Sequence, residues 1–167
     1  MAAIVTIDES NGALEAQEVD IANSNMGNVD DAELDPVSYP ITPGENSYEK
    51  WQRFNVSDMN GSSEISNLKV WRTGALGGAA THKTNARTAD YGGAETYAEP
   101  VKTASAVADQ TMPTSAPASA NLGIGGALAG SLTAEGYSDY LVHQIQTNAA
   151  DVAGSSSVLN FQYDEIA

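Results

Sequence analysis

The chain has 167 residues, no cysteine and a formal net charge of −15, from 22 acidic and 7 basic side chains. This length suits about one domain, and the lack of cysteine excludes disulfides, thiolate metal sites and a cysteine nucleophile. Because phosphate contacts need Lys and Arg, the charge argues against nucleic-acid or anionic-membrane partners. We interpret the acidity first as a solubility surface, with a saline habitat or a basic partner surface as alternatives.

The first third of the chain is predicted to hold little regular structure. Ala3–Ile7 is a short β-branched run and a predicted strand. No basic region with a following apolar run precedes it, so we expect no signal peptide and synthesis in the cytoplasm. Residues 8–35 are acidic and lack an apolar stripe, which predicts an extended arm or long loop. Val37–Ile41 is a second predicted strand, and Pro40 places it at a sheet edge.

Residues 44–72 hold both tryptophans and supply much of the predicted core. Trp51–Met59 and Ile65–Arg72 have strand composition and flank a turn signal, so they predict an antiparallel hairpin. Alternation places one set of side chains together on the core face: Phe54, Val56, Leu68 and Val70. Trp51 and Trp71 fall on the opposite face, where they either cover a second layer or mark a contact surface.

The rest of the chain alternates long loops with short strand signals. Thr73–Gly93 is predicted to be a loop, and Lys102–Leu122 is either a disordered linker or an ordered loop lying over the sheet. Four further strands are predicted, at Glu95–Val101, Ala127–Thr133, Tyr137–Thr147 and Val158–Tyr163. We therefore predict an all-β fold, an antiparallel β-sandwich of immunoglobulin-like or jelly-roll-like type with an extended N-terminal arm at 1–36 and the sandwich at 37–167.

No motif predicts a catalytic residue, a cofactor or a metal. His143 alternates with apolar neighbours and is expected to be a hydrogen-bonded sheet residue, and His82 has no nucleophile signature near it. Gly123–Gly130 lacks the Lys-Ser/Thr ending of a phosphate loop. The acidic run Asn28–Asp35 does not follow the calcium-loop pattern, so a solvated charge run is expected.

Aromatic side chains could instead include a sugar-stacking platform, although core positions are the commoner use of aromatics on a sandwich. The candidates are Tyr48, Trp51, Trp71, Tyr91, Tyr97, Tyr137 and Tyr140. Exposure of both tryptophans on one sheet face would favour the platform.

Four segments carry a family resemblance: NSYEKW (46–51), NLKVWR (67–72), LTAEGYSDYLVHQIQ (132–146) and FQYDEIA (161–167). In this order they resemble small β-sandwich virion structural proteins of tailed bacteriophages and related viruses, over roughly residues 40–167. Such proteins serve as capsid decoration (cement) proteins, head fibres or tail components.

The resemblance implies a capsid decoration protein on the virion surface that binds the outside of the major capsid protein shell and associates with itself. The motifs carry no catalytic meaning, so we expect no enzymatic activity, and from the charge we expect no nucleic-acid or membrane partner. Trp51, Trp71, Asp30, Asp31 and Asp35 are the predicted interface residues. A tail or head-fibre component that contacts the host, and a carbohydrate-binding β-sandwich module, remain as alternatives.

Overall fold

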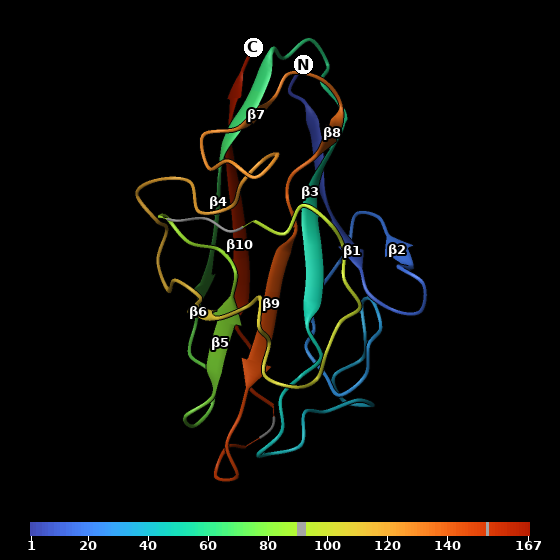
Figure 1. Ribbon diagram of the computed structural model, residues 1–167, viewed down its shortest axis with the longest axis vertical. Coiled ribbons are helices and arrows are strands. Elements are labelled where there is room, and N and C mark those ends of the chain that lie inside the picture. Colours follow the sequence, from blue (N-terminus) through green and yellow to red (C-terminus); the bar gives the residue numbers. More distant parts are fainter. Residues whose placement is uncertain (90–92, 153) are drawn as a thin grey trace.

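A computed structural model describes residues 1–89, 93–152 and 154–167 (Figure 1). Within these ranges the chain forms strands and no helix, arranged as two antiparallel sheets. The predicted all-β, sandwich-like fold is confirmed. No described helix is long and apolar enough to cross a membrane.

The larger sheet has seven strands in the order β2-β1-β3-β9-β5-β6, and β8 pairs with β3 beside this path. Its strands are β1 (Ile4–Ser10), β2 (Gln17–Glu18), β3 (Lys50–Asp58), β5 (Thr81–Thr84), β6 (Gln110–Thr111), β8 (Gly136–Tyr137) and β9 (Leu141–Gln146). The smaller sheet has the order β10-β4-β7, from β4 (Glu64–Thr73), β7 (Ser131–Leu132) and β10 (Val158–Ile166).

The predicted hairpin of β3 and β4 is wrong. β3 pairs with β1, β8 and β9, whereas β4 pairs with β10 and β7 in the other sheet. The linking turn at Asn60 (φ 48) and Gly61 (φ 89) carries the chain from one sheet to the other. Each strand has one apolar face, and packing the two faces against each other buries both.

The prediction that the apolar faces of β3 and β4 meet in one core is nevertheless confirmed. The main core contains Phe54, Val56, Leu68 and Val70, together with Leu141 of β9 and Met112 and Leu122 from the long loop. Phe161 and Tyr163 of β10 pack edge-to-face on Phe54, with ring centroids 5.5 and 6.3 Å away. The core therefore joins both sheets.

A second, smaller core lies on the outer face of the larger sheet. It contains Trp51, Ala108, Tyr140 and Val142 and is covered by partly buried Tyr97 and Val107. Gln144 holds the covering segment, since its amide accepts from Ser105 N at 3.1 Å and donates to Thr103 O at 2.8 Å. Of the two alternatives for Lys102–Leu122, the ordered loop over the sheet is therefore the one observed.

The other strand predictions need smaller corrections. Val37–Ile41 and Glu95–Val101 form no strand, and Ala127–Thr133 contributes only Ser131 and Leu132. The predicted strand Tyr137–Thr147 is split into β8 and β9, because the N–H groups of Asp139 and Tyr140 donate to Gly123 O (3.0 Å) and Ala94 O (2.8 Å) instead of to β3. β5 lies inside the predicted loop Thr73–Gly93.

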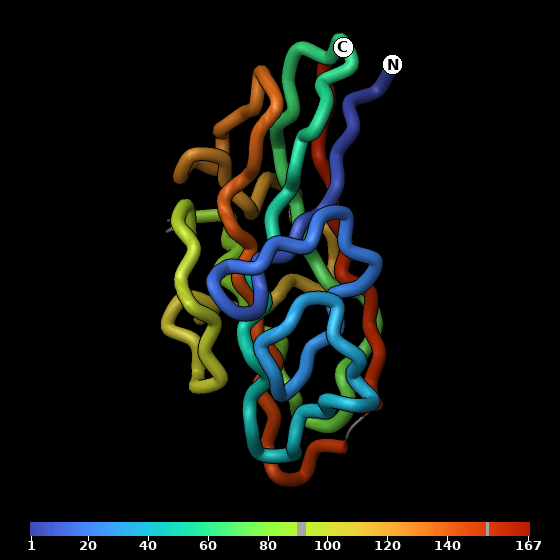
Figure 2. Tube along the Cα trace, turned by 90° about the vertical axis from the view of Figure 1, so that its right-hand side faces the viewer, coloured from blue at the N-terminus to red at the C-terminus, as the bar shows by residue number. Residues whose placement is uncertain are grey.

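The N-terminal segment is folded onto the sandwich. β1 pairs with β3 over six positions, and residues 11–43 lie across the side of the two sheets (Figure 2). Leu34 is 3% exposed and Gly27 is buried. The boundary at residue 36 stays a prediction, but the segment before it does not extend away from the molecule.

Candidate functional site

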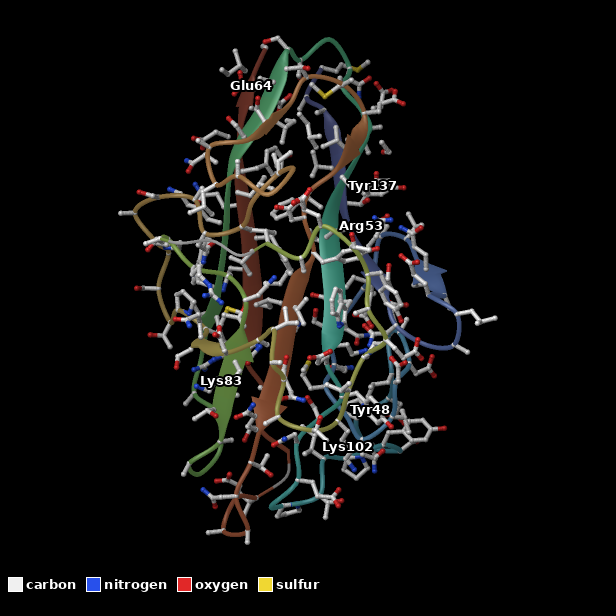
Figure 3. The ribbon with its side chains drawn as sticks, viewed as in Figure 1. Tyr48, Arg53, Glu64, Lys83, Lys102 and Tyr137 are labelled. Carbon is white, nitrogen blue, oxygen red and sulfur yellow. The ribbon has the colours of Figure 1, made fainter. Side chains whose placement is uncertain are left out.

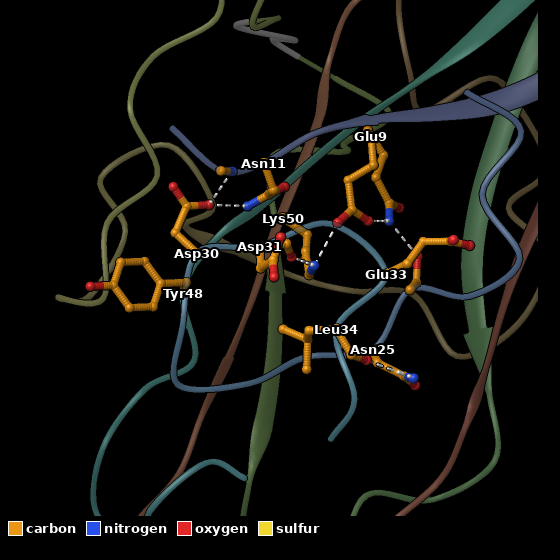
Figure 4. A network of polar contacts seen from close by, with 12 residues as sticks. Glu9, Asn11, Asn25, Asp30, Asp31, Glu33, Leu34, Tyr48 and Lys50 are labelled. Atoms are coloured by element: carbon orange, nitrogen blue, oxygen red, sulfur yellow. Dashed lines mark hydrogen bonds and ion pairs between the residues drawn. The ribbon is translucent and has the colours of Figure 1, made fainter. Parts of the chain in front are cut away.

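A row of polar side chains crosses the inner face of the larger sheet below the main core. Lys50 of β3 and Glu9 of β1 form an ion pair, with 2.5 Å between Nζ and Oε1, and both side chains are almost fully buried (Figure 4). Lys50 also donates to the Asp31 carbonyl. This pair ties the N-terminal segment to the sheet.

The row continues through Gln52 to two histidines. Gln52 Nε2 donates to Glu9 Oε2 at 2.6 Å, and Gln52 Oε1 lies 3.2 Å from His143 Nε2. His143 Nδ1 lies 2.9 Å from His82 Nε2. Because Gln52 Oε1 can only accept, the bonding pattern assigns the Nε2–H tautomer to both rings. The row thus links β1, β3, β9 and β5.

The histidines are held neutral. Burial lowers the pKa of His82 to about 3, and the nearby Arg72 adds to the effect. Burial, then His82 and Lys50, lowers the pKa of His143 well below its usual value. Burial also raises the pKa of Glu9, because desolvation outweighs the attraction of Lys50. His82 Nδ1 is buried without a hydrogen-bond partner. Two neutral rings that bond to each other act as a structural bridge between strands.

Three asparagines that sequence reasoning missed use their side-chain amides to bond backbone groups of a neighbouring strand, in the way that a further strand residue would. The Asn11 amide donates to Glu49 O (2.7 Å) and accepts from Trp51 N (2.9 Å). Asn85 does the same for Tyr140 O and Val142 N, and Asn121 pairs with both backbone groups of Val70. All three are at most 1% exposed. Asn11 and Asn85 directly follow β1 and β5, and this position after a strand is the only sequence signal for them.

The five predicted interface residues are not brought together on one face. Trp51 is 2% exposed and lies between Tyr97 and Tyr140, with ring centroids 5.5 Å away in each case. Trp71 is half-buried on β4, in the other sheet. The two tryptophans therefore do not form an exposed platform on one face. Tyr91 lies outside the described residues.

The acidic run is fixed to the molecule at several points. Asp30 Oδ1 accepts from Asn11 Nδ2 (2.8 Å) and from Gly12 N (3.0 Å). Asp31 and Asp35 are exposed. Ser38 and the Val37 N–H donate to Asp35 and lower its pKa. No group of three or more metal-ligating side chains is arranged for an ion in the described ranges.

Tyr137 is an accessible aromatic residue on the outer face of the larger sheet. The Arg53 guanidinium of β3 lies 3.7 Å from the ring centroid of Tyr137 on β8, and Tyr137 is 43% exposed (Figure 3). This cation–π pair lies next to the second core, since the Arg53 guanidinium is also 4.9 Å from the ring centroid of Tyr140. It presents a flat aromatic and guanidinium surface to solvent.

A cavity of about 700 Å³ lies between the sheets at the end away from the chain termini. The larger sheet contributes Ile7, His82, His143 and Ile145, and β10 contributes Val158, Leu159 and Phe161. The rim is formed by residues 21–26, by residues within 36–43 and 76–80, by Asp151 and Val152, and by residues 154–157. Val37, Val152 and Val158 on this rim are 86%, 71% and 60% exposed. The cavity is thus lined mostly by apolar side chains, with His82, His143, Asp151 and several Ser and Asn residues among them, and its rim leaves apolar surface in water.

β10 borders this cavity and has a free edge. It pairs only with β4 among the described strands, with a bulge between Gln162 and Asp164. Its nine residues place alternate backbone N–H and C=O groups away from β4. A free edge of this length can accept a further strand.

Comparisons with known proteins give no relative. No protein-family model matches the chain, and neither the curated proteins nor the solved structures contain a match.

Proposed function

We propose that this protein is a non-enzymatic structural component of a virion, a decoration protein that binds the outside of the major capsid protein shell and stabilises it. The observation that carries the proposal is the free nine-residue edge of β10. A strand edge binds an extended segment of a partner through backbone hydrogen bonds, which is a common mode of protein recognition. Segments between residues 40 and 167 led us to expect the same role from the sequence.

Charge and polar bonding also support a binding role. A net charge of −15 keeps copies apart in solution and favours a basic partner surface. The buried polar row from Glu9 to His82 is used in bonds between strands, with His82 and His143 neutral. We propose Trp71, Asp31 and Asp35 as parts of the contact surface, since each is accessible. Symmetric self-association around a capsid axis is the expected oligomeric arrangement.

Binding to purified, undecorated shells of the virus that encodes the protein tests the proposal. We expect saturation at a fixed ratio of protein to shell subunits and a higher temperature of shell disruption. Amide hydrogen exchange should slow in β10 on binding, because the added strand pairs its outward N–H groups. Binding to isolated tails with none to shells would exclude decoration and leave a tail or fibre component.

A further inference from the structure

The cavity and the β10 edge lie side by side, and their chemistry is complementary to one kind of partner. Leu159 and Phe161 of β10 line the cavity from one sheet, and Ile7 and Ile145 line it from the other. A strand added to the free edge of β10 would point alternate side chains between the sheets, as strands of a sandwich do. Those side chains would enter the apolar side of a cavity of about 700 Å³, between Leu159 and Phe161 on one sheet and Ile7 and Ile145 on the other.

The surroundings of the cavity are acidic. The N-terminal fifty residues, which supply one side of the rim, carry eleven acids and one base, although Asp8, Glu9, Glu49 and the base Lys50 are buried. Asp151 lines the cavity itself. Asp35 is exposed next to the lining residue Pro36. The described lining contains no Lys or Arg. Basic residues on either side of an inserted segment would therefore meet carboxylates.

We propose that the cavity and the β10 edge form a docking groove for an extended protein segment with aliphatic side chains at alternate positions and basic flanks. The exposed rim valines Val37 and Val158 contact the first side chains that enter. Only one part of this proposal rests on the proposed function: the identification of the shell protein as the source of the segment. Its chemistry follows from the cavity, the free edge and the charge.

Four exposed positions provide matched variants. Val37→Gln and Val158→Gln change the rim, and both residues line the cavity. Val19→Gln and Leu14→Gln are the controls, since these residues are 56% and 96% exposed, do not line the cavity and lie outside β10. All four side chains are largely in water, so the variants should fold alike.

Two probes are used with each variant. The first is a short synthetic peptide that alternates valine with threonine between pairs of lysines, with a serine-for-valine peptide as its control. The second is the undecorated shell. We expect each rim variant to weaken binding about tenfold, which corresponds to loss of one buried valine contact. The controls should stay within about twofold, and the serine peptide should not bind.

The outcomes separate the groove from the decoration role. Peptide binding that depends on the rim, without shell binding, supports the groove and excludes the shell as its partner. If all four variants bind the shell equally well, the proposal of a decoration protein stands and the proposal of a docking groove is rejected. The groove is also overturned if the wild-type protein binds neither probe, or if concentration-dependent pairing of two copies accounts for all protection of β10.

Discussion

Lys50 is the only base in the first fifty residues, and it is buried on the inner face of β3 against Glu9. Removing one partner of a buried ion pair leaves an uncompensated charge. We expect Lys50→Met to lower the free energy of unfolding by about 3–5 kcal/mol, measured by urea denaturation. Adding Glu9→Gln to Lys50→Met should recover much of the loss.

The exposed pair Lys102–Glu45 is the control for this prediction, with 2.7 Å between Nζ and Oε2. Solvent screens this pair, so Lys102→Met should change stability much less than Lys50→Met does. Equal effects of the two substitutions would contradict the structural role assigned to the buried pair.

The two buried histidines make stability depend on pH. Their pKa values are lowered in the folded protein, to about 3 for His82 and well below the usual value for His143, so below pH 6.5 the unfolded chain binds protons that the folded chain does not. Stability is therefore full above pH 6.5 and falls as the pH is lowered. We expect a loss of about 1.4 kcal/mol per pH unit for each histidine between pH 6 and pH 5.

Urea titrations at several pH values measure this slope, and the variant His82→Gln with His143→Gln should flatten it. The range from pH 6 to pH 5 lies above the pH at which protonation of carboxylates with lowered pKa values, such as Asp109, begins to destabilise the protein. Glu9 has a raised pKa, so its contribution has the opposite sign. A slope that persists unchanged in the double variant would assign the pH dependence to other groups.

At the scale of elements, period-two alternation predicted which side chains of β3 and β4 share the core, but not which strands pair. Alternation defines the two faces of a strand, and both a hairpin and a face-to-face pair bury the same apolar faces. Asn60 and Gly61 both have positive φ values, as in a hairpin turn, so the turn does not exclude the hairpin. The pairing of β4 with β10 and β7, which come later in the chain, excludes it. The cavity and the β10 edge could not be predicted, because they arise from segments far apart in sequence, such as 36–43 and 158–161.

The asparagine bridges also lay beyond sequence reasoning, and they can be tested. Asn121 holds the long loop on β4 through Val70 N and Val70 O, both at 2.8 Å. Asn121→Ala leaves two buried backbone groups unpaired, so we expect a loss of about 2–3 kcal/mol in the free energy of unfolding. Asn148→Ala is the control, because Asn148 is exposed and its side chain makes only a local turn bond to Ala150 N. Similar losses in both variants would show that Asn121 is not a specific anchor.

At the scale of the whole molecule, the charge opposes the compact state. The described residues form three ion pairs, which leaves most carboxylates without a basic partner. Salt screens repulsion between exposed charges and affects buried pairs less. We expect the melting temperature to rise by roughly 2–8 °C between low salt and about 0.5 M sodium chloride, as for a gain of about 1–2 kcal/mol in a chain of this size.

Two variants locate the origin of the salt effect. Asp31→Asn removes one exposed charge from the densest acidic run, so it should raise the melting temperature at low salt and change it little at high salt. The loss caused by Lys50→Met should be nearly independent of salt, since that pair is buried. Choline chloride should act like sodium chloride if screening is responsible. A sodium-specific increase would instead indicate a bound cation and would contradict a purely electrostatic origin.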